Sequence, residues 1–426
     1  MPDLLALSAR IIDSGTDNGE RTNRLTGELS EIVPGVAMVE AFGHVVAFDT
    51  GAGLLVFDTS STRFGEQVVE ALRGWRDVPI DTIVYTHGHF DHVGGAQAFL
   101  DDAARRGHPR PRIVAQANVV PRMVRYDLTN GYNAIINARQ FAPTRRTEMR
   151  QARFGSGFVT PDFEYEEQAS LRVGGLTAHL RHALGETDDH TWAWVPEHRA
   201  ICSGDLLTWV FPNAGNPQKV QRYPAEWAVA LREMIALEPE LLLPAHGLPI
   251  AGRDRIRLVL DEAATALEGL VEEVLRRMNA GERLDAIVAG VRVPGHLLQR
   301  PWLRAVYDEP EFVVRNTWRL YGGWYDGNPA HLKPATDAEL AREMAALAGG
   351  AARLAARAEA LSKDGQHRLA CHLGEMASLA APGEGEVQRI RAAVYEARAA
   401  TESSLMARGI YLSAAAESRE AAGEPG

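Results

Sequence analysis

The stretch from Thr86 to Gly95, THGHFDHVGG, carries the most informative residues of this chain. Three of the fourteen histidines and one aspartate fall within positions 87–92. Histidine is the side chain that most often binds metal ions and transfers protons near neutral pH. The apolar run DTIVYT at 81–86 predicts a buried strand, and the glycine pair at 94–95 predicts the start of a helix. The spacing therefore predicts a metal-binding loop between a strand and a helix.

The loop offers ligands for two neighbouring ions. Side chains two residues apart in an extended turn point the same way, so we expect His87 and His89 to hold one ion. Asp91 and His92 then face a second site beside it. Imidazole and carboxylate ligands suit zinc and harder divalent cations, and such sites leave positions open for water. A loop of merely solvated histidines would not explain this spacing directly after a buried strand.

The composition is that of an ordinary globular protein, with 46% hydrophobic and 24% charged residues among 426. A net charge of −11 argues against a nucleic-acid partner, which would be met by a basic surface. Cys202 and Cys371 are too few for a disulfide framework or a cysteine-built zinc site. We find no basic start followed by an apolar core at the N-terminus and no run of about 18 apolar residues. These features lead us to expect a cytoplasmic protein without a membrane span.

The predicted secondary structure changes near Gly252. Before it, strand-length apolar segments lie at 35–42, 44–50, 53–59, 112–116, 191–196, 199–204 and 241–246, and helical spacing appears at 63–75 and 94–106. This alternation predicts sheets covered by helices. After it, alanine- and leucine-rich amphipathic helices are predicted at 255–281, 335–365 and 386–417. We therefore predict an α/β domain over 1–252 and an all-helical domain over 253–426.

The loop closely resembles the HxHxDH signature of the metallo-β-lactamase superfamily. That resemblance implies an αββα sandwich with metal ions at one edge of the sheets. Other expected residues follow in the expected order, namely Asp58 in GLLVFDT, Asp205 in CSGDLL and His246 in LLPAHG. The resemblance implies that Asp58 braces the loop, that Asp205 bridges two ions, and that His246 completes the second site with Asp91 and His92.

One position departs from the usual superfamily pattern. Where a histidine normally completes the first site, this chain reads HALGETDDHTWAW, with Glu186 in its place. A carboxylate here resembles the alkyl sulfatase branch, so we assign Glu186 to the site of His87 and His89. His182 and His190 stand four residues away on either side and are the alternatives. For the following aspartates, 188 and 189, we expect solvated or helix-capping roles.

The C-terminal half resembles the same branch. NTWRLYGGWYDGNPAHLKP and the helical segments over roughly 340–420 resemble the alkyl sulfatase helical dimerisation domain. The resemblance implies a homodimer. It also leads us to expect these two domains without the lipid-carrier-like domain that characterised alkyl sulfatases carry at the C-terminus.

The predicted function is a dinuclear, zinc-dependent hydrolase that cleaves a sulfate ester with a metal-bound hydroxide. Asp91 is the expected base that orients the attacking water, and manganese and iron are the alternative metals. A small anionic ester needs hydrogen-bond donors beside the metals, and the polar loops 129–141 and 211–227 offer Tyr132, Asn133, Lys219 and Arg222. The alternatives are hydrolysis of a β-lactam, lactone or thioester on the same fold, or a metal-binding dimer without turnover.

Overall fold

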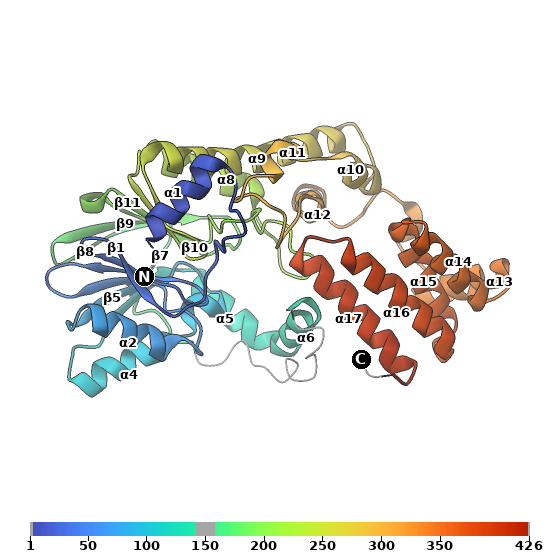
Figure 1. Cartoon of the computed structure of the whole chain (residues 1–426), viewed down its shortest axis with the longest axis horizontal. Coiled ribbons are helices and arrows are strands. Elements are labelled where there is room, and N and C mark those ends of the chain that lie inside the picture. Colours follow the sequence, from blue (N-terminus) through green and yellow to red (C-terminus); the bar gives the residue numbers. More distant parts are fainter. Residues whose placement is uncertain (1–2, 142–157, 425–426) are drawn as a thin grey trace. The chain divides into compact units, whose positions relative to one another are not determined.

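The computed structural model describes residues 3–141 and 158–424, and the chain forms two compact units (Figure 1). The first unit comprises the chain up to Thr129 together with the described residues from 158 to Gly323. The second comprises Asn130–Phe141 and the described residues from Trp324 onward.

Two mixed sheets form the centre of the first unit. In the described residues, one sheet has seven strands in sequential order, β1 (Leu29–Val33), β2 (Val36–Val39), β3 (Val45–Asp49), β4 (Leu54–Phe57), β5 (Ile80–Val84), β6 (Arg112–Gln116) and β7 (Phe163–Tyr165). The other has six, in the order β13 (Ile250–Ala251), β12 (Leu241–Pro244), β11 (Ala200–Gly204), β10 (His190–Val195), β9 (Leu176–Ala183) and β8 (Gln168–Val173).

Strand β4 shows how its sequence sets the layers. Its residues alternate between the two faces of the sheet, as the two-residue period of a strand requires. Leu55 and Phe57 enter the core between the two sheets, whereas Leu54 and Val56 pack on the other side against α2 (Gly65–Trp75) and α4 (Ala96–Arg106). With both faces buried, the strand reads as a continuous apolar run.

Helices also cover the outer face of the six-stranded sheet. There α1 (Leu4–Ser14), α8 (Pro224–Ala236) and α9 (Arg253–Asn279) share a core with residues of β10, β11 and β12. Figure 1 shows α8 and α9 on this side and α2 and α4 on the other. The predicted αββα sandwich is confirmed.

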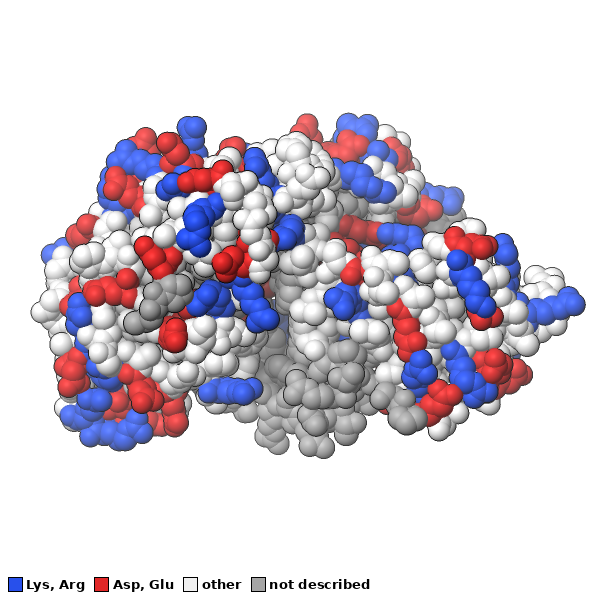
Figure 2. Space-filling view, in the orientation of Figure 1, with Lys and Arg blue, Asp and Glu red and all other residues white. Residues whose placement is uncertain are grey.

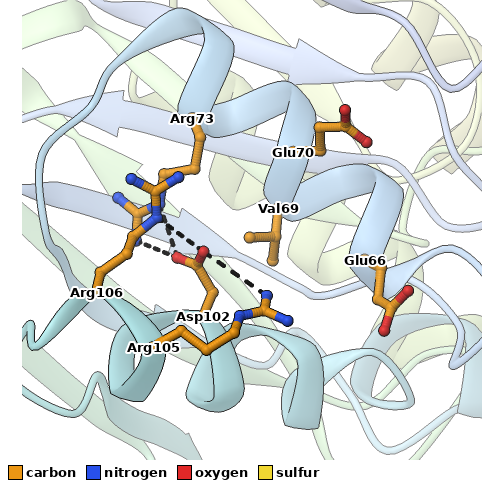
Figure 3. A pocket seen from close by; sticks show the side chains of 7 residues that line it. All are labelled: Glu66, Val69, Glu70, Arg73, Asp102, Arg105 and Arg106. Atoms are coloured by element: carbon orange, nitrogen blue, oxygen red, sulfur yellow. Dashed lines mark hydrogen bonds and ion pairs between the residues drawn. The ribbon is translucent and has the colours of Figure 1, made fainter.

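A buried ion pair ties α2 to α4 on the outer face of the seven-stranded sheet (Figure 3). Arg73 Nη2 lies 2.6 Å and Arg106 Nε 2.9 Å from the carboxylate of Asp102. A pocket of about 340 Å³ lies beside them, lined by Glu66, Val69, Glu70, Arg73, Asp102, Arg105 and Arg106. Its charges are paired or exposed, and none of the predicted metal ligands lines it.

The helix predicted from 255 to 281 is α9, whose buried face includes Ile256, Leu260 and Leu267. It belongs to the first unit, as do α10 (Leu284–Gly290), α11 (Gly295–Leu298) and α12 (Pro310–Gly322). The change of compact unit therefore falls between Gly323 and Trp324. The division into a catalytic domain over 1–252 and a helical domain over 253–426 stays a prediction.

The second unit consists of helices in its described residues. They are the short 3₁₀ helix η2 (Pro329–His331) and the α-helices α6 (Asn130–Phe141), α13 (Asp337–Ala348), α14 (Ala351–Lys363), α15 (His367–Ala380), α16 (Gly385–Ala400) and α17 (Leu405–Ala421). The helix predicted over 335–365 is two helices, because Gly349 and Gly350 have positive φ and end α13. The prediction of a polar loop over 129–141 is wrong, since most of that stretch is α6.

Acidic and basic side chains intermingle on the face of the molecule drawn in Figure 2. Within residues 3–141 and 158–424, none of the helices combines the length and the apolar character needed to cross a membrane.

The β2–β3 turn packs directly on the histidine loop. A Cβ atom at Gly43, where φ is +73°, would lie 1.9 Å from the carbonyl oxygen of Asp91. Gly51 has a similar φ of +78°, but its Cβ would meet nothing within 4 Å among the described residues. The two positions therefore separate backbone strain from a steric clash.

We expect Gly43→Ala to destabilise the chain more than Gly51→Ala. Both variants place an alanine in the left-handed region, at about 1–2 kcal/mol. Gly43→Ala must also displace the backbone at Asp91, which adds about 1–3 kcal/mol. Urea unfolding of both variants measures the difference, and equal losses of free energy would contradict the packing described for the turn.

Candidate metal centre

The predicted ligands stand where strands end at one edge of the two sheets. Parallel strands β4 and β5 are followed by Asp58 and by the loop carrying His87. Parallel strands β11 and β12 are followed by Asp205 and His246. Because the carboxyl ends of parallel neighbours meet at the same edge of a sheet, four segments distant in sequence deliver polar side chains to one place.

Two backbone hydrogen bonds join the sheets at this edge. The N–H of Thr191, on β10, donates to the carbonyl of Thr86 at 2.6 Å. The N–H of His44, between β2 and β3, donates to the carbonyl of Ala245 at 2.6 Å. The histidine loop and the segment carrying His246 are thus fixed relative to each other.

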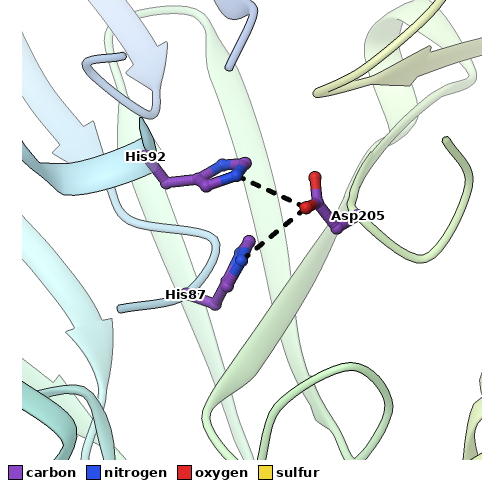
Figure 4. Close-up of side chains that lie close together, drawn as sticks. All are labelled: His87, His92 and Asp205. Carbon is purple, nitrogen blue, oxygen red and sulfur yellow. Dashed lines mark ion pairs between the residues drawn. The ribbon is translucent and has the colours of Figure 1, made fainter. Parts of the chain in front are cut away.

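Asp205 lies at the centre of the cluster (Figure 4). Its Oδ2 atom is 3.8 Å from His87 Nε2 and 3.5 Å from His92 Nε2. Its Oδ1 atom is 3.6 Å from His246 Nε2. These separations suit groups that share a cation, since ligand atoms around one ion lie about 3–4 Å apart when metal–ligand distances are about 2 Å.

Asp91 stands at one end of the cluster. Its Oδ2 atom is 3.3 Å from His246 Nε2 and 3.7 Å from His92 Nε2. The candidate ligand groups are therefore Asp91, His92 and His246; His87, His92 and Asp205; and His89, Glu186 and Asp205. Every predicted metal ligand occurs in at least one of these groups, and His92 and Asp205 each occur in two.

Glu186, rather than either neighbouring histidine, joins the cluster. Its Oε1 atom lies 3.8 Å from His89 Nδ1. His182 Nε2 instead donates to the carbonyl of Asp188 at 3.0 Å. His190 Nε2 accepts from the backbone N–H of Asp205 at 3.0 Å, and its ring stacks on His87 with centroids 4.9 Å apart. His190 therefore positions two candidate ligands without joining them.

Asp58 holds the loop from behind. At a φ of +63° it adopts the left-handed conformation at the end of β4, which costs energy for a residue other than glycine. One carboxylate oxygen accepts from the N–H of Thr86 at 2.7 Å, and the other accepts from the Thr86 hydroxyl and lies 2.8 Å from His92 Nδ1. This carboxylate–histidine contact leaves Nε2 of His92 for a metal.

A second support was not foreseen. Asp189 is fully buried and accepts from the N–H of Gly88 at 2.7 Å and from Arg122 Nε at 2.9 Å. Arg122 also pairs with Asp188. The expectation of a solvated or capping role is therefore wrong for Asp189, which braces the histidine loop. No spacing in the sequence links Arg122, on α5 (Val119–Leu128), to that loop.

The electrostatics of the cluster favour a bound cation. Burial lowers the pKa of His87 and His89 well below the usual range, so both are neutral and ready to act as ligands. Burial acts against the charge of His92 too, but the carboxylates of Asp205, Asp91 and Asp58 prevail and raise its pKa. Without a metal, the excess negative charge is balanced by protonated histidine.

The chemistry of the donor set fits divalent metal ions. His92 Nε2 and Asp205 Oδ1 are buried and have no hydrogen-bond partner among the described residues. A buried polar atom without a partner is costly, and ligation to a cation removes that cost. Both atoms belong to the candidate ligand groups, so the residues present fit the site that the sequence predicts.

The four predicted substrate contacts lie in different parts of the chain. Arg222 is buried at the cluster, with Nη1 2.6 Å from Glu186 Oε1. Lys219 is close enough to Glu186 and Asp91 for their charges to act on its pKa. Tyr132 and Asn133 lie on α6 in the second unit, where Tyr132 is exposed and Asn133 is buried.

Comparison with known proteins agrees with this geometry. A family model for the metallo-beta-lactamase superfamily matches residues 39–246, and a model for alkyl sulfatase dimerisation matches residues 283–421. A linear primary-alkylsulfatase from a Pseudomonas species is 29% identical over 70% of this chain and 59% of its own length. An (R)-specific secondary-alkylsulfatase from Pseudomonas is 24% identical over 93% of this chain and 63% of its own length.

A solved structure shares the fold. The stereoselective inverting sec-alkylsulfatase from Pseudomonas superimposes with a TM-score of 0.80 at 22% identity, covering 93% of this chain and 65% of that one. The chain spans about three fifths of the length of the curated relatives it matches. The two matched family models follow each other along the sequence and together take in most of it. Residues 39–246 therefore form a metallo-β-lactamase superfamily domain and residues 283–421 match alkyl sulfatase dimerisation, and together with the curated relatives they support the alkyl sulfatase-like branch of that superfamily.

Proposed function

We propose that this protein is a dinuclear metal-dependent hydrolase of sulfate esters, with zinc as the expected metal. His87, His89 and Glu186 would hold one ion, Asp91, His92 and His246 the other, and Asp205 would lie between them. The observation that carries the proposal is the convergence of these side chains at one sheet edge, where the buried atoms His92 Nε2 and Asp205 Oδ1 have no hydrogen-bond partner within the described part of the chain.

The residues of the chain have separate roles in this reaction. When bound, the ions would lower the pKa of a water molecule from 15.7 to about 7 and withdraw charge from the ester oxygens. In the chain without metal, burial raises the pKa of Asp91, but the charges of His92 and His246 outweigh it and lower that pKa to about 2. A bound cation would likewise favour the ionised carboxylate, which can then accept a hydrogen bond from the attacking water. Asp58 and Asp189 keep the loop in place during turnover.

Cationic side chains beside the cluster suit an anionic ester. Arg222 Nε is buried and has no hydrogen-bond partner among the described residues, which leaves a charged donor for a sulfate oxygen. Lys219 adds a second positive charge nearby. Tyr132 and Asn133 remain predicted contacts. The curated relatives are named as alkylsulfatases, which supports a sulfate ester over the other substrate classes.

The proposal is tested by metal-replete protein assayed against sulfate esters, lactones, β-lactams and thioesters. We expect about two metal ions per chain by elemental analysis and release of inorganic sulfate from an alkyl sulfate. Removal of the metal with a chelator should abolish the activity, and added zinc should restore it. Turnover confined to a lactone, β-lactam or thioester would replace sulfate with that bond.

Asp91→Ala should lower kcat by at least about a hundredfold, because it removes a metal ligand and the hydrogen-bond partner of the water. Asp101→Ala is the matched control, since Asp101 is an exposed acid on the neighbouring helix α4. Steady-state kinetics of both variants at saturating metal give the comparison. Near-normal kcat in Asp91→Ala would remove Asp91 from the mechanism.

Lys219 should make substrate binding pH-dependent. Burial and the charge of Arg222 lower its pKa to about 8, so the ammonium group is present below that pH and lost above it. We expect KM for a sulfate ester to rise severalfold between pH 7 and 9.5 while kcat changes less. Lys219→Arg keeps the charge and should flatten the rise. If KM of Lys219→Arg rose with pH as steeply as that of the wild type, Lys219 would be excluded from substrate binding.

We also propose a homodimer, on the strength of the dimerisation segment. The alanine- and leucine-rich stripe of α14 is buried within the second unit, so it does not supply the interface. Leu340 and Leu347 are exposed, one above the other on α13, and are the better candidates. Light scattering should give about twice the 46.5 kDa of one chain, and Leu347→Glu should lower that mass. A wild-type mass of one chain would contradict the dimer.

A further inference from the structure

A carboxylate distant in sequence from the histidine loop holds the segment that carries Asn213 and Arg222. Asp308 is fully buried just before α12, and its Oδ2 accepts from the N–H groups of Gly215 at 2.6 Å and Asn216 at 3.1 Å. Its Oδ1 accepts from the N–H of Glu309 at 2.7 Å. Both oxygens are thus occupied by backbone donors.

Asn316, on α12, fixes the same segment at two further points. Its Nδ2 donates to the carbonyls of Ala214 and Arg222, each at 2.9 Å. The segment also approaches α12 closely, because a Cβ atom at Gly215 would lie 2.4 Å from backbone atoms of Phe312 and Val313. Residues 214–222 therefore rest on α12 at both ends.

This segment delivers two side chains to one candidate metal ligand. Asn213 Nδ2 donates to Glu186 Oε1 at 2.6 Å, and Arg222 Nη1 lies 2.6 Å from the same oxygen. Arg222 Nη1 also donates to the carbonyl of Asn213 at 2.7 Å, which closes the segment on itself. The orientation of Glu186 is therefore set by a segment that α12 supports.

We propose that Asp308 and Asn316 are positioning residues for the Glu186 metal site, acting through Asn213 and Arg222. The two residues lie in the stretch matched by the alkyl sulfatase dimerisation model, yet both belong to the first compact unit. Part of the stretch matched as a dimerisation segment thus serves the metal centre. This inference rests on the proposed binding of two metal ions.

Asp308→Asn tests the proposal in the full-length chain. The amide has nearly the same size, but either orientation sets its NH₂ group against a backbone N–H donor. Asp102→Asn is the matched control, because Asp102 is also buried and joins two helices, accepting from Arg73 Nε at 2.8 Å and Arg106 Nε at 2.9 Å on the outer face of the seven-stranded sheet. Both variants exchange a carboxylate for an amide.

Zinc affinity is measured by competition with a chromophoric chelator, and the visible spectrum of the Co²⁺-loaded protein reports ligand geometry. We expect Asp308→Asn to bind one of two ions about tenfold more weakly and to change the Co²⁺ spectrum, as loss of an outer-shell partner does. Asp102→Asn should match the wild type in both measurements, even where its thermal stability falls.

Gly215→Ala gives an independent perturbation of the same contact if Asp308→Asn does not fold. Its Cβ displaces the segment from α12 without removing a polar group, so it should weaken the same ion. Wild-type affinity for both ions in a folded variant of either kind would overturn the inference. Fewer than two ions in the wild type would instead contradict the proposed function.

Discussion

Four carboxylates, Asp58, Asp91, Glu186 and Asp205, share one buried edge of the sandwich, and their mutual repulsion has to be compensated. Taking so many like charges out of water is unfavourable unless cations or hydrogen-bond donors lie beside them. The structure meets this demand with imidazoles that gain protons, with Arg222, and with backbone N–H groups. The arrangement is one that divalent cations would stabilise.

The same constraint explains the supports around the cluster. Asp58 adopts a strained backbone conformation to reach Thr86 and His92, and the buried pair of Arg122 and Asp189 holds the backbone of Gly88. Asp58, Arg122 and Asp189 orient the candidate ligands and are not candidate ligands themselves. Deep burial of these polar residues is costly in itself, and it is offset by the hydrogen bonds that each of them completes.

The sequence predicts the layers, and it predicts which side chains lie together in the cluster of candidate ligands, because both depend on local signals. The candidate ligands directly follow strand-length apolar runs, and HxHxDH places four of them within six residues. The supports could not be predicted, since Asp189 meets Arg122 only through the packing of α5, and Asp308 meets Gly215 only through α12. The polarity of 129–141 predicts a loop, yet most of this stretch is helical and packs against α17.

The hydrogen bond from His44 to Ala245 joins positions about 200 residues apart in the chain. Contacts of such long sequence separation form slowly, because the entropy of closing the intervening loop is lost before the contact is gained. Among the residues that the structure describes, every strand of the seven-stranded sheet precedes every strand of the other. During synthesis the histidine loop therefore emerges well before Asp205 and His246, and the ligand cluster is completed late in folding.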